Sequence, residues 1–176
     1  MEPISSTHGW GRDIFSLAMA IQNIMWGIGV FVAGAIADRR GPVLVLMFGS
    51  LIYAGGVFGM SIADAPLLLQ LTGGLMTGLG VAFTAFSLVI AVMAKVVSPE
   101  RRALVMGLGT AAGSAGQVIF APIAQGYMQN YGWAATLVML AGIVLVIIPL
   151  TWCLPRGQVI DDAANKQSLK EALSEA

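Results

Sequence analysis

The stretch Gly34-Ala-Ile-Ala-Asp38-Arg39-Arg40-Gly41-Pro42 is a short charged turn between two long apolar runs. No charged side chain occurs in residues 14–37 before it or in residues 43–63 after it. Each run is long enough to cross a lipid bilayer as a helix, because about 20 apolar residues span the hydrocarbon layer. The sequence therefore predicts that the charges of this turn lie at a membrane face.

The composition is that of a membrane protein. Of the 176 residues, 57% are hydrophobic and only 10% are charged, whereas soluble domains carry about 25% charged residues. The net charge is zero, and no basic run indicates a nucleic-acid partner. The single cysteine, Cys153, and the single histidine, His8, form no disulfide framework or metal-ligand spacing. We predict an all-α, polytopic membrane protein surrounded by lipid, with no cofactor and no metal.

Charge-free runs and the breaks between them predict five transmembrane helices. Their expected ranges are about residues 14–37, 43–62, 66–94, 103–125 and 133–154. The last two share one charge-free run, residues 103–155, which is about twice as long as a single span. Residues 125–133 combine polar, turn-forming and aromatic side chains, so we place the break there. The bundle then occupies residues 1–155, and residues 156–176 form a cytoplasmic tail.

Capping residues support these helix starts. Asp13 is the expected N-cap of the first helix, and Pro66 lies in the first turn of the third. Ser98 is the expected N-cap of the helix that follows. In the tail, Ser168 and Glu171 have the spacing of a capping box, which predicts the start of an amphipathic helix.

Basic residues predict the orientation of the helices. Only Arg12 falls on one side of the five-helix layout, and the other side carries Arg39, Arg40, Lys95, Arg101, Arg102, Arg156, Lys166 and Lys170. Basic residues concentrate on the cytoplasmic side of membrane proteins. The N-terminus is therefore expected outside and the C-terminus in the cytoplasm.

Polar residues inside the predicted helices indicate where function lies. An unsatisfied amide costs several kcal/mol in lipid, so these side chains must face another helix or a wet cavity. The third helix carries three of them at seven-residue intervals, a spacing that an α-helix places on one face. We interpret six residues as possible cavity-lining residues, with packing between helices as the alternative: Gln22, Asn23, Gln70, Thr77, Thr84 and Gln117.

Helix packing can also be predicted in outline. The second and fifth helices are almost uniformly aliphatic, so we expect both to face lipid. Three glycine pairs have the GxxxG spacing that permits close approach of two helices, and we interpret them as packing sites: Gly55 and Gly59, Gly74 and Gly78, Gly109 and Gly113.

The charged turn resembles the loop signature of the major facilitator superfamily, which is a glycine, any residue, a branched aliphatic residue, alanine, aspartate, arginine, any residue and glycine. The matching residues are Gly34, Ile36, Ala37, Asp38, Arg39 and Gly41. This chain has Pro42 and Val43 where the family signature continues with two basic residues. A tight cytoplasmic turn alone would also favour glycine, proline and arginine, but it would not call for an acidic residue.

The resemblance extends along nearly the whole chain. Residues 107–133, with Gly113, Gln117 and Pro122, look like the fifth helix and outer loop of bacterial facilitators of the monocarboxylate and oxalate/formate type. The five predicted helices are then similar to the second through sixth of a twelve-helix transporter. On this alignment we expect that the first helix and the C-terminal half of the transporter lie outside this chain.

The resemblance also implies a function. Such a transporter moves its substrate by alternating access, with the substrate bound near the membrane midplane between two halves. The implied substrate is a small organic anion, with possible proton or anion coupling, and the implied location is the bacterial inner membrane. Asp38 would act at the cytoplasmic gate, together with Gly34, Arg39 and Gly41, through a partner in the missing half.

Two other classes of function remain open from the sequence. The chain could be a self-standing five-helix membrane scaffold that buries its polar side chains by assembling into oligomers. An enzyme is less compatible with the sequence, since no set of Ser, His and Asp and no pair of intramembrane carboxylates appears.

Overall fold

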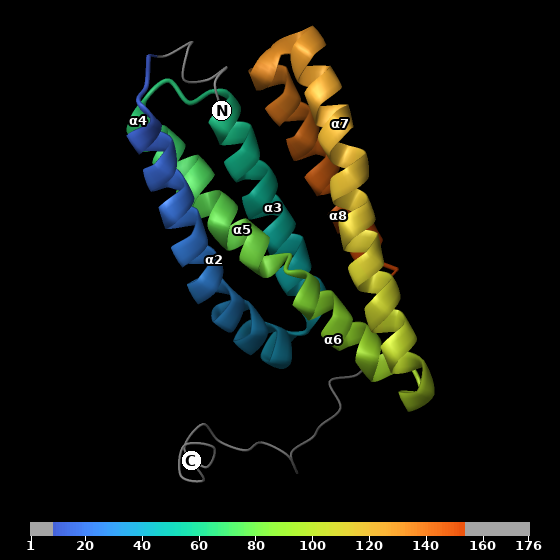
Figure 1. Cartoon of the computed structure of the whole chain (residues 1–176). Coiled ribbons are helices and arrows are strands. Elements are labelled where there is room, and N and C mark those ends of the chain that lie inside the picture. Colours follow the sequence, from blue (N-terminus) through green and yellow to red (C-terminus); the bar gives the residue numbers. More distant parts are fainter. Residues whose placement is uncertain (1–8, 154–176) are drawn as a thin grey trace.

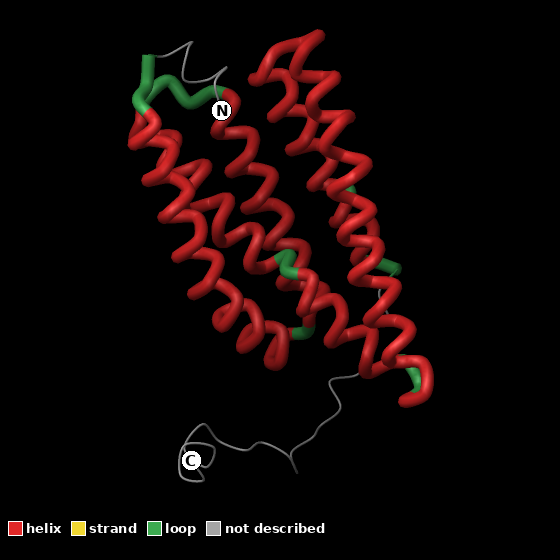
Figure 2. Tube along the Cα trace, viewed as in Figure 1, coloured by secondary structure: helices red, strands yellow, loops and turns green. Residues whose placement is uncertain are grey.

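The structure, a computed structural model, describes residues 9–153. The predicted tail at residues 156–176, with the expected amphipathic helix at Ser168 and Glu171, lies outside the described residues, as does His8. Within residues 9–153 every regular element is a helix, as Figure 2 shows. The all-α prediction is confirmed for this part of the chain.

Four helical segments are long and apolar enough to cross a membrane. They are α2 (Arg12–Arg40), α3 (Pro42–Ser61), the third segment that begins at Pro66, and a last segment from Glu100 to Thr151. Figure 1 shows these segments running alternately between the two ends of the molecule. This arrangement is that of an integral membrane protein.

The last segment is too long for a single crossing, and it contains a reversal. It comprises α7 (Pro99–Leu145) and α8 (Ile147–Thr151), which together with Val146 account for all of its 52 residues. At Gly132 the backbone leaves the helical region, with φ 82° and ψ 172°, and the chain turns back on itself (Figure 1). Only glycine adopts such angles without strain.

This reversal is much tighter than the sequence predicts. We expected a break across residues 125–133, but the helix continues to residue 131 and is interrupted at Gly132 alone. The polar side chains of this stretch are compatible with a helix, because an amide can bond to its own helix. Asn130 Nδ2 donates to the Gly126 carbonyl at 2.8 Å, for example.

The third segment is not one continuous helix over residues 66–94. It consists of α4 (Pro66–Leu69), the π-helix η1 (Gln70–Met76), α5 (Thr77–Phe83) and α6 (Phe86–Val96). Thr84 and Ala85 separate α5 from α6, and this interruption is visible as a loop-coloured link in Figure 2. Pro66 occupies the first turn of α4, as predicted.

Helix starts differ in detail from the sequence prediction. Gly11, and not Asp13, is the N-cap of α2, and Asp13 lies in the first turn, where its charge favours the positive helix end. Ser98 is the N-cap residue of α7 as predicted, although its side chain makes no capping hydrogen bond.

The helix α3 is the most buried of the long apolar segments, which contradicts its predicted lipid-facing position. It packs against α2, η1 and α5 on one side and against α7 and α8 on another. Small side chains along it, such as Gly49, Ser50 and Ala54, allow this close packing. An aliphatic helix can face lipid or other helices equally well, because both surroundings are apolar.

Glycines bring α2, α3 and α5 into close contact. A Cβ atom at Gly78 would lie 2.6 Å from the Gln22 carbonyl oxygen of α2, and one at Gly80 would lie 2.5 Å from Cα of Tyr53 in α3. The Gly74 and Gly78 pair faces α2, as its GxxxG spacing indicates. At Gly113, by contrast, an added Cβ atom would meet nothing within 4 Å.

Candidate functional site

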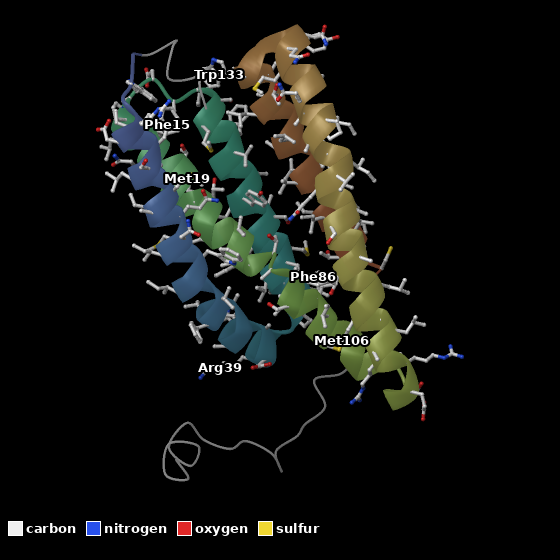
Figure 3. The ribbon with its side chains drawn as sticks, in the orientation of Figure 1. Phe15, Met19, Arg39, Phe86, Met106 and Trp133 are labelled. Atoms are coloured by element: carbon white, nitrogen blue, oxygen red, sulfur yellow. The ribbon has the colours of Figure 1, made fainter. Side chains whose placement is uncertain are left out.

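The signature turn, residues 34–42, joins α2 to α3 at one end of the molecule. Asp38, Arg39 and Arg40 form the exposed last turn of α2, and Gly41 is both the C-cap of α2 and the N-cap of α3. Figure 3 places Arg39 at this end, and Phe15 and Trp133 near the opposite end. We call the end that carries Arg39 the basic end.

The two glycines of the signature occupy different environments. Gly41 has φ 88° and ψ 150°, and its N–H group donates to the Ala37 carbonyl at 2.9 Å. Gly34 lies within α2, and an added Cβ atom there would meet nothing within 4 Å. Gly41 is therefore required by the backbone, whereas Gly34 leaves an open surface on α2.

Basic residues of two separate elements gather at the basic end. Arg39 and Arg40 close α2, and Arg101 and Arg102 lie in the first turn of α7, which begins at the same end (Figure 1). All four side chains are exposed. Arg12 lies at the start of α2, toward the other end. Of the other basic residues predicted on this side, Lys95 belongs to α6, and Arg156, Lys166 and Lys170 lie outside the described residues.

The amides predicted to line a cavity lie at the edges of the bundle. Gln22 is half-buried where α2 crosses Gly78, and Asn23 is exposed and donates to the Met19 carbonyl at 2.8 Å. Gln117 is exposed on the first half of α7, residues 99–131. In Figure 1 α2 and α7 lie on opposite sides of α3 and α5, so this chain alone does not bring Gln117 beside Gln22 and Asn23.

A π-helix lies between the first two of the polar residues predicted to share one face of the third segment. Gln70 begins the π-helix η1, and Thr77 follows directly after it. A π-helix bonds i to i+5 and fits more residues into each turn, so the seven-residue spacing of Gln70 and Thr77 loses the register that an α-helix would keep. Between Thr77 and Thr84 the helix is α5, which keeps that register. Gln70 and Thr84 are half-buried, whereas Thr77 is 6% exposed and packs against α3.

Buried hydroxyl groups are satisfied within their own helices. Thr77 Oγ1 donates to the Thr72 carbonyl at 2.8 Å, a five-residue separation that fits the π-helix, and Thr72 Oγ1 donates to the Leu68 carbonyl at 2.7 Å. The same holds for Ser50 Oγ, 2.8 Å from the Leu46 carbonyl. The donor protons of these hydroxyl groups are therefore already used within the helices.

Two backbone features of the third segment went unpredicted. Neither residues 70–76 nor Thr84 and Ala85 include a proline, and Pro66, four residues before the π-helix, indicates only a helix start. The glycine-rich sequence of residues 73–80 is the local signal for irregular backbone, and its Gly74 and Gly78 pair by itself predicts only helix packing. In the described part of the chain, no group of three or more His, Cys, Asp or Glu residues could hold a metal ion.

The alternating apolar helices, the charged turn and the satisfied intrahelical hydroxyls define a polytopic helical membrane protein. Residues 1–174 match the Major Facilitator Superfamily. The chain therefore belongs to this superfamily, whose members are transporters and not enzymes.

The relatives include proteins named as monocarboxylate transporters and proteins named as multidrug resistance proteins. The chain is 31% identical to monocarboxylate transporter 13 of Rattus norvegicus over 135 residues, 77% of this chain and 30% of that protein. It is 29% identical to monocarboxylate transporter 11 of Homo sapiens over 136 residues, 77% of this chain and 28% of that protein. It is 34% identical to the multidrug resistance protein MdtH of Escherichia coli over 152 residues, 84% of this chain and 36% of that protein.

The chain spans about a third of the length of these curated relatives.

Proposed function

We propose that this chain is part of a secondary transporter that moves a small organic anion across the bacterial inner membrane by alternating access. The observation that carries the proposal is the likeness to proteins named as monocarboxylate transporters, which covers 77% of the chain. Proton or anion coupling would drive the movement. The basic end would face the cytoplasm, because basic residues concentrate there.

The proposal also gives the number of transmembrane helices and their counterparts in a complete transporter. The reversal at Gly132 supports two crossings within α7 and α8, so the chain would have five transmembrane helices. These would correspond to the second through sixth helices of a twelve-helix facilitator. A transporter half with six further helices would be the partner of this bundle.

At the basic end, Asp38 would be the gating residue. Its carboxylate is exposed at the end of α2 and is therefore accessible to a donor on a partner domain. Charge-assisted hydrogen bonds of this kind are short and roughly twice as strong as neutral ones. Arg39, Gly34 and Gly41 would shape the surface on which that contact forms.

The substrate cavity would be lined by amides on α2 and on the first half of α7. Gln22, Asn23 and Gln117 suit this role because they are half-buried or exposed, and lipid is an unfavourable neighbour for an amide. Gln70 and Thr84 are half-buried and would also line the cavity, with the Thr84 hydroxyl proton donated to the Gly80 carbonyl at 2.8 Å. Thr77 would contribute through the shape of η1 and α5, since its hydroxyl is bonded to Thr72.

A self-standing membrane scaffold is not favoured, since the chain belongs to a transporter family. Drug transport is the second candidate, and the 34% identity to a multidrug resistance protein supports it. The two functions differ in the substrate that is moved, so a direct transport assay separates them.

The test measures uptake by proteoliposomes. They contain the whole protein encoded by the reading frame to which this chain belongs. We expect accumulation of radiolabelled lactate, a small monocarboxylate, and no extrusion of a cationic dye. Asp38→Asn should slow lactate uptake about tenfold or more, since a charge-assisted hydrogen bond is worth about 1.5–3 kcal/mol. Membrane levels of the variant should stay normal, because the residue is exposed.

Asp64→Asn is the matched control, since Asp64 is an exposed aspartate in the turn between α3 and α4. It should leave uptake unchanged. Equal slowing by both variants would contradict the gating role of Asp38. Dye extrusion without lactate uptake would replace the organic-anion proposal with drug export.

A further inference from the structure

One arginine of the basic end lies at the head of an apolar stripe on α7, which begins at that end (Figure 1). Residues spaced three or four positions apart share one face of an α-helix. The residues of this face, which we call the Arg101 stripe, are Arg101, Leu104, Leu108 and Ala112. All of them are exposed, and Leu104 and Leu108 are each 61% exposed.

The Arg101 stripe lies on the side of α7 opposite to its polar side chains. At about 100° per residue, Gln117 lies about 180° around the helix from Leu108, and Thr110 lies about 180° from Arg101. Lipid is an unfavourable neighbour for an amide and a favourable one for leucine. If the side with Gln117 faces the proposed cavity, the Arg101 stripe faces lipid.

The position of Arg101 along α7 matches the level of lipid headgroups. The rings of Tyr127 and Tyr131 contact each other near the other end of this half, with centroids 4.5 Å apart. Such aromatic side chains concentrate at the membrane–water interface. Arg101 is about 39 Å from Tyr127 along the helix, and a bilayer with its headgroups is about 40–45 Å thick. Arg101 therefore lies at the headgroups of the other leaflet, and Leu104 and Leu108 lie at the level of its acyl chains.

The guanidinium group of Arg101 is accessible to an anion, because its side chain is exposed. The carboxylate nearest to it in sequence, that of Glu100, accepts hydrogen bonds from the Ser98 hydroxyl and from its own backbone N–H group. A guanidinium group binds phosphate through two parallel hydrogen bonds. A guanidinium group followed by exposed leucines therefore matches a phospholipid, which has a phosphate followed by acyl chains.

The neighbouring Arg102 carries the same charge on a different face of α7. It shares its face with Gly109, where an added Cβ atom would lie 3.0 Å from Phe86 Cζ of α6. Figure 3 shows Phe86 and Met106 where α6 and α7 lie side by side. The face of Arg102 thus continues into the contact with α6 and not into the exposed leucines.

We propose that the Arg101 stripe binds one anionic phospholipid of the cytoplasmic leaflet. The Arg101 guanidinium group donates to the lipid phosphate, and the acyl chains lie along the rest of the stripe. The cytoplasmic leaflet carries the anionic lipids that attract basic residues. The site rests on the proposed orientation, with the basic end in the cytoplasm. It is separate from Asp38 and from the amides of the proposed cavity.

The test measures lipid binding by native mass spectrometry. The sample is the whole protein encoded by the reading frame to which this chain belongs, freed of lipid in detergent. It is titrated with phosphatidylglycerol, which is anionic, or with phosphatidylcholine that has the same acyl chains and no net charge. We expect the first phosphatidylglycerol to bind about fivefold more tightly than the first phosphatidylcholine.

Substitutions of single arginines distinguish a site from general attraction by charge. Arg101→Gln should weaken phosphatidylglycerol binding about tenfold or more, because it removes the charge and the paired hydrogen bonds. Arg101→Lys keeps the charge alone and should weaken binding about threefold. The matched control Arg102→Gln should weaken it only about twofold, because a charge beside the site acts through screening solvent. Arg12→Gln, at the opposite end, should have no effect.

A photoreactive lipid tests the apolar part of the site. Phosphatidylglycerol with a diazirine in one acyl chain is added at one lipid per protein. It should label Leu104, Leu108 or Ala112 and not Thr110 on the opposite face. Arg101→Gln should lose this labelling.

Several results would overturn the proposal. Equal weakening by Arg101→Gln and Arg102→Gln, or equal binding of the two lipids, would show that no specific site exists. Labelling of Thr110 would place the lipid on the other face of α7. Glycerol phosphate, the headgroup without acyl chains, should not displace the lipid at equal concentration; displacement would show a site for soluble phosphates instead.

Circular dichroism reports whether each variant is folded. If Arg101→Gln does not fold, the comparison of Arg101→Lys with the native protein decides. No transport is measured, so the result is independent of the proposed substrate.

Discussion

The two glycines of the signature turn, Gly34 and Gly41, are glycine for different physical reasons. Gly41 occupies backbone angles that side chains with a Cβ atom adopt only with strain. Gly34 has helical geometry and open space around it, so its own fold does not need glycine. Both positions match the family signature, but the backbone requires glycine only at Gly41. At Gly34 the glycine leaves space on the surface of α2.

This difference predicts opposite results for two similar substitutions. Gly41→Ala should lower the free energy of unfolding by about 1–3 kcal/mol, the usual cost of such backbone strain. Gly34→Ala should cause no loss of stability, because alanine is the better helix former. Titration of the purified chain with sodium dodecyl sulfate, followed by circular dichroism, measures both. A larger loss for Gly34→Ala than for Gly41→Ala would contradict this assignment.

At the scale of elements, the third segment shows how tertiary contacts override local preference. Its sequence predicts one helix, and its turn-forming residues at residues 64–66 correctly predict where that helix starts. Inside it, glycine contacts with α2 and α3 accompany a π-helix and a break that the local sequence does not indicate. Helix propensity is weak enough for such contacts to dominate.

The close packing of α5 on α3 predicts that replacing one glycine by alanine lowers stability, whereas replacing another does not. Gly80→Ala should lower the free energy of unfolding by about 1–3 kcal/mol, because its Cβ atom would overlap backbone atoms of Tyr53. Gly113→Ala, in a helical position where a Cβ atom meets nothing within 4 Å, is the matched control. It should leave stability unchanged or raise it by up to about 1 kcal/mol. Equal losses for the two variants would argue against glycine-mediated packing.

At the scale of the whole molecule, α3 links two groups of helices. It packs against α2, η1 and α5, and also against α7 and α8. The contact with the second half of α7 joins Ala54 and Val57 to Ala141. A further contact, between Phe15 of α2, Ala63 and Leu69, closes the opposite end from Arg39.

The alternation of the helices predicts which turns face which side of the membrane. Single cysteines at Asp64, Arg102 and Asn130 in a Cys153→Ser background can be labelled with a membrane-impermeant maleimide. Asp64→Cys and Asn130→Cys should react on intact bacterial spheroplasts, and Arg102→Cys only after permeabilisation. Labelling of Asn130→Cys from the same side as Arg102→Cys would contradict the two crossings proposed for α7 and α8.

The sequence by itself determined that this is an all-helical membrane protein, where most spans begin, and which charged residues gather at one end. Long charge-free runs and charged turns are local properties, and a bilayer responds to them directly. The motif at residues 34–41 also indicated the family to which the chain belongs.

Only the tertiary structure decided that α3 is central, that residues 70–76 form a π-helix, and that the third segment breaks at Thr84 and Ala85. Lipid and neighbouring helices are equally apolar, so hydrophobicity does not tell which of them a helix will contact. That choice depends on close contacts between residues distant in sequence, such as Gly80 with Tyr53 and Gly49 with Phe83.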